Sequence, residues 1–213
     1  MKTDDLISDL ALSARPTRPH AAAFRLIGGL ALGAIVSMAL LIGMFGAPLR
    51  DIPVTGVPAF AMKLAFAAAM AGIGGLLAYI SGQPGRSLRL RVFWLLVPPA
   101  VIAVGAALEL GDASAASQAN LWFGATWHTC LLTVSLVAVP IFLGIVWGFE
   151  RLAPTHLQET GCLAGVTAGA TSATLYALYC PETTATFLLS WYTLAIAVAG
   201  IAGALVGPRL LRW

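Results

Sequence analysis

The sequence predicts an all-α membrane protein: a six-transmembrane-helix bundle with both termini in the cytoplasm and a short amphipathic helix at its amino terminus. Three observations predict this fold class. Of the 213 residues, 59% are hydrophobic and only 10% are charged, whereas a soluble domain carries about 25% charged residues. Long charge-free runs reach the ~20 apolar residues that a helix needs to cross a bilayer core. Lysine and arginine gather at alternate ends of these runs, as the positive-inside rule requires.

Six apolar stretches are long enough to span a bilayer. They are Ala22–Phe45, Val57–Ile80, Val92–Leu110, Trp127–Phe149, Gly161–Leu178 and Phe187–Val206. The fifth is the least apolar, because it is rich in Gly, Ala and Thr. The first is longer than the ~7–15 apolar residues of a signal peptide and lacks a cleavage site, so we expect it to be retained. The chain thus divides into a cytoplasmic tail, 1–21, and a transmembrane domain, 22–213.

The orientation follows from the basic residues. Ten fall on one side of the predicted bundle: Lys2, Arg15, Arg18, Arg25, Arg86, Arg89, Arg91, Arg151, Arg209 and Arg212. Only Arg50 and Lys63 fall on the other. The positive-inside rule therefore places both termini in the cytoplasm. The net charge of +3 reflects this topology, and no basic patch with interleaved aromatic residues points to nucleic acid.

Glycines spaced four residues apart indicate closely packed helices. The pairs and triplets are Gly29 and Gly33, then Gly161, Gly165 and Gly169, then Gly203 and Gly207. Small residues let helix backbones approach in a membrane, where lipid offers no hydrophobic driving force. We interpret these glycines as contacts within the bundle, and a homodimer interface is the alternative. Pro98 and Pro99 in the third stretch and Pro140 in the fourth are expected to bend their helices.

Charged residues inside the stretches are few, which argues against a transporter. Arg25, Lys63 and Glu109 lie near predicted helix ends, where we expect them to reach the interface by snorkelling. No acidic residue falls at mid-membrane, and no repeat relates the two halves of the chain. A small-molecule transporter or channel with an incidental tail is nevertheless the alternative function. No phosphate-binding loop, H-E-x-x-H or G-x-S-x-G motif occurs, so we predict no enzyme and no required cofactor.

Two cysteines lie at the predicted outer face. "WHTC" places His128 and Cys130 at the start of the fourth stretch, and "YCPET" places Cys180 and Glu182 after the fifth. Three interpretations stay open: a disulfide or redox pair in an oxidising compartment, a soft-metal site of both thiols with His128 and Glu182, or two unrelated interfacial cysteines. Cys162 is expected to be a small buried hydrophobe.

The tail begins "MKTDDLISDL", a pattern typical of a short amphipathic helix. Thr3 can cap it, and acidic residues in its first turn suit the helix dipole. Leu6, Ile7 and Leu10 form an apolar stripe at helical spacing. The neighbouring acids disfavour an anionic membrane surface, so we expect this stripe to dock in the groove of a basic cytoplasmic partner. Docking on the loop Arg86–Arg91 of the same chain is the alternative.

The order of short motifs along the chain resembles one protein family. The motifs are "MKTDDLISDLA", "QPGRS", "WHTC", Cys180-Pro181 and "GALVGPRLLRW". The chain is similar to the NrsF type (negative regulator of sigma F), six-span anti-sigma factors of the bacterial inner membrane. This resemblance implies that the tail sequesters an extracytoplasmic-function sigma factor through Asp4, Asp5, Leu6, Ile7, Asp9 and Leu10. It also implies that Cys130 and Cys180 take part in sensing metal or oxidative stress in the envelope.

Overall fold

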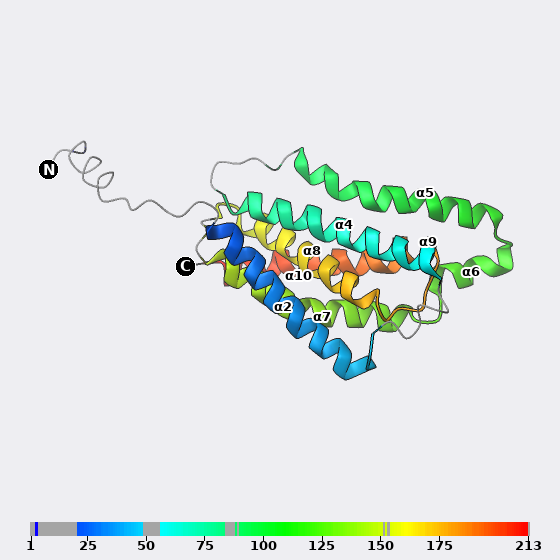
Figure 1. Ribbon diagram of the computed structural model, residues 1–213. Coiled ribbons are helices and arrows are strands. Elements are labelled where there is room, and N and C mark those ends of the chain that lie inside the picture. Colours follow the sequence, from blue (N-terminus) through cyan, green and yellow to red (C-terminus); the bar gives the residue numbers. More distant parts are fainter. Residues whose placement is uncertain are drawn as a thin grey trace.

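The computed structural model describes residues 21–48, 56–83, 88, 90–150, 152 and 154–212, together with Thr3. These residues form an all-helical bundle, and no strand occurs among them. The long helices run alongside one another, and α2 begins at the same end of the bundle as α10 finishes (Figure 1). We call this the arginine end, after Arg25 and Arg209, and the opposite end the cysteine end, after Cys130 and Cys180.

The chain passes along the bundle six times. The passes are α2 (Ala21–Phe45), α4 (Val57–Ser81), η1 with α5 (Arg91–Leu96, Val97–Asp112), α7 (Trp127–Phe149), α8 (Leu157–Tyr176), and α9, η2 and α10 (Ala185–Phe187, Leu188–Tyr192, Thr193–Leu210). All six predicted stretches are therefore helical. A short further helix, α6 (Ala115–Phe123), was not predicted. It is only nine residues long and lies at the cysteine end (Figure 1).

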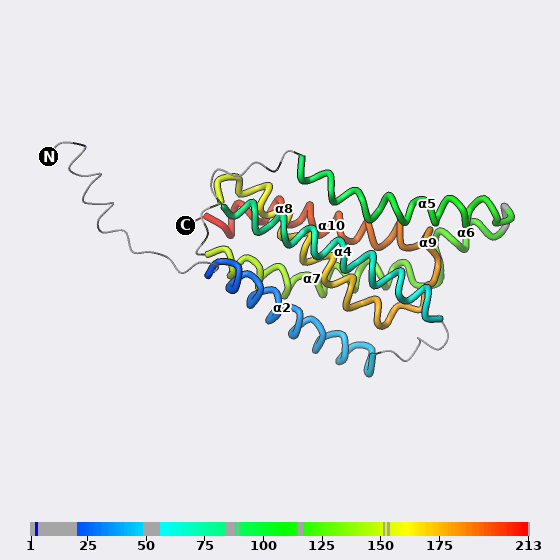
Figure 2. The backbone as a smooth tube through the Cα atoms, turned by 45° about the horizontal axis from the view of Figure 1, so that its top comes forward, coloured from blue at the N-terminus to red at the C-terminus, as the bar shows by residue number. Residues whose placement is uncertain are grey.

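Five of these passes are long and apolar enough to cross a membrane, and α8 is the exception. The reason is its position. Helix α8 packs against α10, α4, α7 and α2, so its Gly, Ala and Thr residues contact other helices instead of lipid. By contrast, α5 lies along the outside of the bundle (Figure 2), and only 17% of the most apolar part of η1 and α5 is buried. The low hydropathy of the fifth predicted stretch is therefore explained by the position of α8 among the other helices.

The glycines spaced four residues apart lie at contacts between helices of the bundle, as predicted. A Cβ on Gly165 would meet the Ala199 carbonyl group of α10, with the carbon 2.9 Å away, and a Cβ on Gly161 would lie 2.9 Å from Gly207 Cα. Between α2 and α7, a Cβ on Gly33 would lie 2.6 Å from Ile141 Cα. Only glycine permits such backbone contact. Whether a homodimer also forms stays a prediction.

The proline predictions are met in part. Pro140 lies inside α7, and the bend expected there stays a prediction. Pro98 and Pro99, however, do not bend an established α-helix: they fall in the first turn of α5, directly after the 3₁₀-helix η1. Proline is tolerated in a first turn because its missing N–H group has no partner there. The third pass is therefore two helices joined at these prolines.

Candidate functional site

The residues predicted to contact a sigma factor lie outside the described residues. They are Asp4, Asp5, Leu6, Ile7, Asp9 and Leu10. Their role and the division at residue 21 stay predictions. The residues predicted to sense a signal are all described, and they lie at the cysteine end.

Cys130 and Cys180 come together in one buried cluster. Cys130 lies in the first turn of α7 and is fully buried, and Cys180 lies between α8 and α9 with only 3% of its surface exposed. Both belong to the same hydrophobic core cluster, and both are free thiols. Antiparallel passes return these positions to one end of the bundle, which is what the sequence predicted.

A tyrosine that the sequence analysis did not single out completes this cluster. Tyr192 is the last residue of the π-helical turn η2 and is fully buried. Its hydroxyl has no hydrogen-bond partner of ordinary geometry, yet it faces Cys180 closely enough to affect the pKa of that thiol. π-Helical turns are rare and are frequent at functional sites. Here the turn places the Tyr192 hydroxyl beside the Cys180 thiol.

The position of Lys63 differs from the one predicted from the sequence. It was expected to snorkel to the interface, but it is fully buried. Its Nζ donates a hydrogen bond of 2.7 Å to the carbonyl oxygen of Cys180. Lys63 therefore ties α4 to the segment that carries Cys180. The prediction failed because a backbone carbonyl, invisible in sequence, offers the ammonium an acceptor inside the bundle. We call Lys63, Cys130, Cys180 and Tyr192 the thiol site.

The surroundings keep Cys180 protonated. Burial raises the pKa of the Cys180 thiol, while the Tyr192 hydroxyl and the Lys63 ammonium act in the opposite direction. The thiolate is the nucleophilic form of cysteine. In this conformation the Cys180 thiol is therefore buried and protonated. It can react with an electrophile only after the surrounding cluster opens.

Glu182 supports this segment by capping α7. Its Oε1 accepts hydrogen bonds from the backbone N–H groups of Ala125 and Thr126, at 2.8 and 3.2 Å, and from the Thr126 hydroxyl at 3.0 Å. Gly124, with φ +55°, makes room for it, since a Cβ there would lie 2.6 Å from the carboxylate. The sequence analysis considered Glu182 as a metal ligand, whereas here it satisfies the orphan donors at a helix start.

Glu109 caps α9 in the same way. It was expected to snorkel, but its two oxygens accept hydrogen bonds from the N–H groups of Ala185 and Thr186, at 2.8 and 3.0 Å, and from the Thr186 hydroxyl. The carboxylate thus joins the end of α5 to the start of the last pass. Sequence reasoning missed both caps because the carboxylates come from distant parts of the chain.

His128 lies apart from the two thiols. Its side chain is exposed, whereas Cys130, two residues later, is buried, and its ring packs against Trp127. In the described part of the chain, no three or more His, Cys, Asp or Glu side chains are grouped so as to hold a metal ion. The site therefore contains the thiols of Cys130 and Cys180 but not His128, which was predicted as the third metal ligand.

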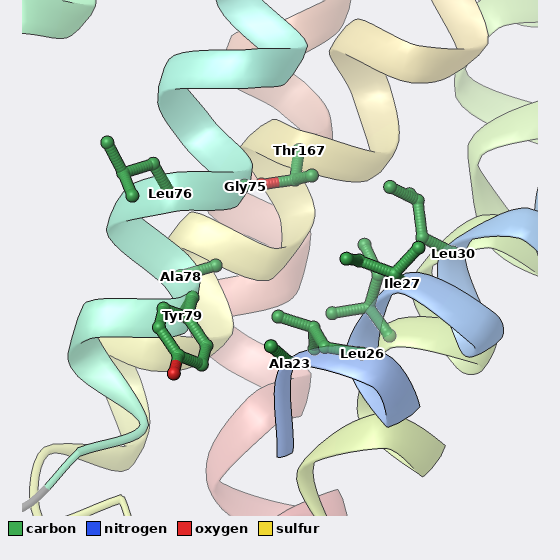
Figure 3. Close-up of a pocket in the computed structure, with 10 residues that line it drawn as sticks. Ala23, Leu26, Ile27, Leu30, Gly75, Leu76, Ala78, Tyr79 and Thr167 are labelled. Atoms are coloured by element: carbon green, nitrogen blue, oxygen red, sulfur yellow. The ribbon is translucent and has the colours of Figure 1, made fainter. Parts of the chain in front are cut away.

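The arginine end carries an ion pair and an apolar groove. Arg25 pairs with Glu150 at 3.2 Å and lies 4.7 Å from the centre of the Trp147 ring. Beside it, a groove of about 250 Å³ runs between α2 and α4 (Figure 3). Its lining is apolar apart from Tyr79 and Thr167. The groove therefore offers no catalytic group, and the polar chemistry lies at the cysteine end.

Comparison with known proteins supports a regulatory role. Residues 10–213 match the family NrsF, described as "Negative regulator of sigma F". The chain is 33% identical over 215 residues to the "Probable anti-sigma-F factor NrsF" of Azospira oryzae, and 32% identical over 217 residues to the "Anti-sigma-F factor NrsF" of Caulobacter vibrioides. Each alignment covers 100% of both chains. No solved structure matches the chain. The chain therefore belongs to the NrsF family of negative regulators of sigma F.

Proposed function

We propose that this protein is an anti-sigma factor that holds an extracytoplasmic-function sigma factor inactive at the bacterial inner membrane. Membership of the NrsF family over nearly the whole chain carries this proposal. Two full-length relatives are named anti-sigma-F factors. The long apolar helices supply the membrane anchor that such a regulator needs.

The amino-terminal tail is the proposed sigma-binding element. Leu6, Ile7 and Leu10 form its apolar stripe, and Asp4, Asp5 and Asp9 add negative charge. A sigma factor presents basic DNA-binding surfaces, so an acidic amphipathic helix has the complementary charge. The distribution of basic residues supports a cytoplasmic location for the tail, which is the compartment of the sigma factor.

The thiol site is the proposed sensor, and we favour oxidation over metal binding as its signal. Cys130 and Cys180 share one buried cluster, while His128 is exposed and apart from them. The positive-inside rule supports an outward position for the cysteine end, and the compartment outside the inner membrane is oxidising. A chemical change at the two thiols would then shift the bundle between two states that differ in affinity for the sigma factor.

A pull-down tests the proposal. The detergent-solubilised protein is isolated from unstressed host cells, and soluble partners are identified by mass spectrometry. We expect a sigma factor with the intact chain and none after deletion of Met1–Ser13. Two point variants sharpen the result: Ile7→Asp places a charge in the apolar stripe, and Ser8→Asp places the same charge on the opposite face. Only Ile7→Asp should abolish binding.

The opposite result would overturn the proposal. If no sigma factor is recovered with the intact chain, even after crosslinking, the anti-sigma function is wrong. A transporter or channel should then be tested, and it should tolerate the same deletion. If Ile7→Asp binds the sigma factor as well as Ser8→Asp does, the tail binds through charge alone, without an apolar stripe.

A further inference from the structure

We propose that Lys63 is a latch that couples the two thiols to helix α4. In the latched state its ammonium is buried and bonded to the Cys180 carbonyl; in the released state it extends to the membrane surface. A disulfide between Cys130 and Cys180 selects the released state. This inference rests on the proposed function and adds the residue through which the thiol site would act on the bundle.

The hydrogen bond of Lys63 links two parts of the fold that a change at the thiols would separate. Its acceptor is the main chain of Cys180 itself, at 2.7 Å. Cys180 lies in the connection between α8 and α9. Its N–H still donates a hydrogen bond of 3.1 Å to the Tyr176 carbonyl oxygen, but its own carbonyl group precedes Pro181 and lies outside regular helix. When Cys180 bonds to Cys130 of α7, its backbone must adapt to disulfide geometry, which is narrow. A rotation of this peptide removes the acceptor from Lys63.

Loss of that acceptor makes the buried position costly. A buried ammonium must be hydrogen-bonded to persist in an apolar core, and Lys63 is fully buried beside the Cys180 carbonyl that accepts its hydrogen bond. Lysine also has another stable position, because its long apolar stem lets the charge reach the interface. Lys63 lies six residues after the start of α4, a rise of about 9 Å. The snorkelling state expected from sequence is therefore the natural alternative to the buried state.

Helix α4 can carry this change along the bundle. It runs from the cysteine end to the arginine end (Figure 1) and packs chiefly on α8. In the half of α4 toward the arginine end the contact is close, since a Cβ on Gly74 would lie 3.0 Å from the Thr167 hydroxyl. A packed interface of this kind has discrete arrangements instead of deforming continuously. Release of Lys63 removes one polar contact that holds α4 in the present arrangement.

Acetylation of lysine tests the latch without a sigma factor. The chain has two lysines, Lys2 and Lys63, so Lys2 serves as an internal reference. The Cys162→Ser variant in lipid nanodiscs is treated with N-acetoxysuccinimide before and after oxidation by diamide, and acetylation is followed by mass spectrometry. In the oxidation, the two thiols give up two protons and two electrons as the S–S bond forms, and the N=N bond of diamide is reduced to the hydrazine.

We expect slow acetylation of Lys63 in the reduced protein and an increase of at least about tenfold relative to Lys2 after oxidation, as a minor state becomes dominant. A matched variant that also carries Cys130→Ser and Cys180→Ser should show no change with diamide. Size-exclusion chromatography of the oxidised protein checks that it is still folded.

Four results would overturn the inference: Lys63 reacting as fast as Lys2 in the reduced protein, equal rates before and after oxidation, no disulfide with diamide, or unfolding on oxidation. Failure of the proposed function is separate, because the pull-down with and without Met1–Ser13 tests it independently. If the pull-down succeeds and acetylation does not change, only the latch is wrong.

Discussion

At the scale of single residues, two carboxylates organise the cysteine end. Glu109 and Glu182 each satisfy the start of a helix that follows much later or earlier in the chain. At α7, Glu182 acts where the local N-cap residue, Thr126, makes no side-chain cap. At α9, Glu109 adds to the local cap made by the Thr184 hydroxyl. The two caps hold the segment that follows Cys180, and Glu182 ties this segment to the start of α7, which carries Cys130. They therefore define the frame in which the thiol site is built.

Glu182→Ala should destabilise the protein. The N–H groups of Ala125 and Thr126 and the Thr126 hydroxyl would lose their acceptor, which we expect to lower the free energy of unfolding by about 1–2 kcal/mol. Thermal unfolding in detergent measures the effect. Asp112→Ala removes an exposed carboxylate at the end of α5 and is the control. Equal melting temperatures for the two variants would contradict the capping role of Glu182.

Lys63 shows how a residue can be recognised in the sequence and yet placed wrongly. A charge inside an apolar stretch is a functional candidate by default, and Lys63 is such a charge. Proximity to the helix start favoured snorkelling. The observed acceptor is a carbonyl 117 residues away along the chain, and no local pattern predicts such a partner.

At the scale of helices, α8 is the element on which the bundle is built. It is the least apolar of the six passes, and it contacts α2, α4, α7 and α10. Its small side chains allow the backbones of α8 and α10 to approach, and van der Waals packing is the main force available between helices in lipid. The small residues of α8 made it a weak candidate for a membrane span in the sequence. The same small residues allow it to pack at the centre of the bundle.

Gly165→Leu should disrupt the contact between α8 and α10. The new side chain would meet the Ala199 backbone, and overpacking of this kind costs about 1–3 kcal/mol. Gly28→Leu is the matched control, because nothing lies within 4 Å of a Cβ at Gly28. Unfolding in increasing concentrations of dodecyl sulfate gives the difference. If both variants resist dodecyl sulfate equally, the close approach of these helices is not essential for stability.

At the scale of the whole molecule, the arginine and cysteine ends differ in chemistry. The arginine end carries Arg25 in an ion pair with Glu150, and the cysteine end carries the thiol site and both carboxylate caps. Six passes return the chain to the end from which it started. A regulator that receives a signal at one end and binds a soluble partner at the other requires such a separation.

The orientation in the membrane is itself a prediction. With both termini in the cytoplasm, alkaline phosphatase fused after Arg212 should be inactive, and the same enzyme inserted at Ala113, in the turn between α5 and α6, should be active. Green fluorescent protein at the same two positions should give the reverse pattern. Active phosphatase at the carboxyl terminus would contradict the positive-inside assignment and would place the thiol site toward the cytoplasm.

The all-helical fold class, the six helical passes and the location of both cysteines at one end of the bundle were predictable from the sequence alone. Each of these depends on patterns local to the chain: apolar length, glycine spacing and the alternation of basic loops. Four features became visible only in the folded structure: the burial of Lys63, the cap at α9 made by Glu109, the exposure of His128 and the orientation of Tyr192. For Lys63 and Glu109 the physical reason is that a buried polar group is stable where another part of the fold supplies its hydrogen-bond partner, and their partners come from distant segments.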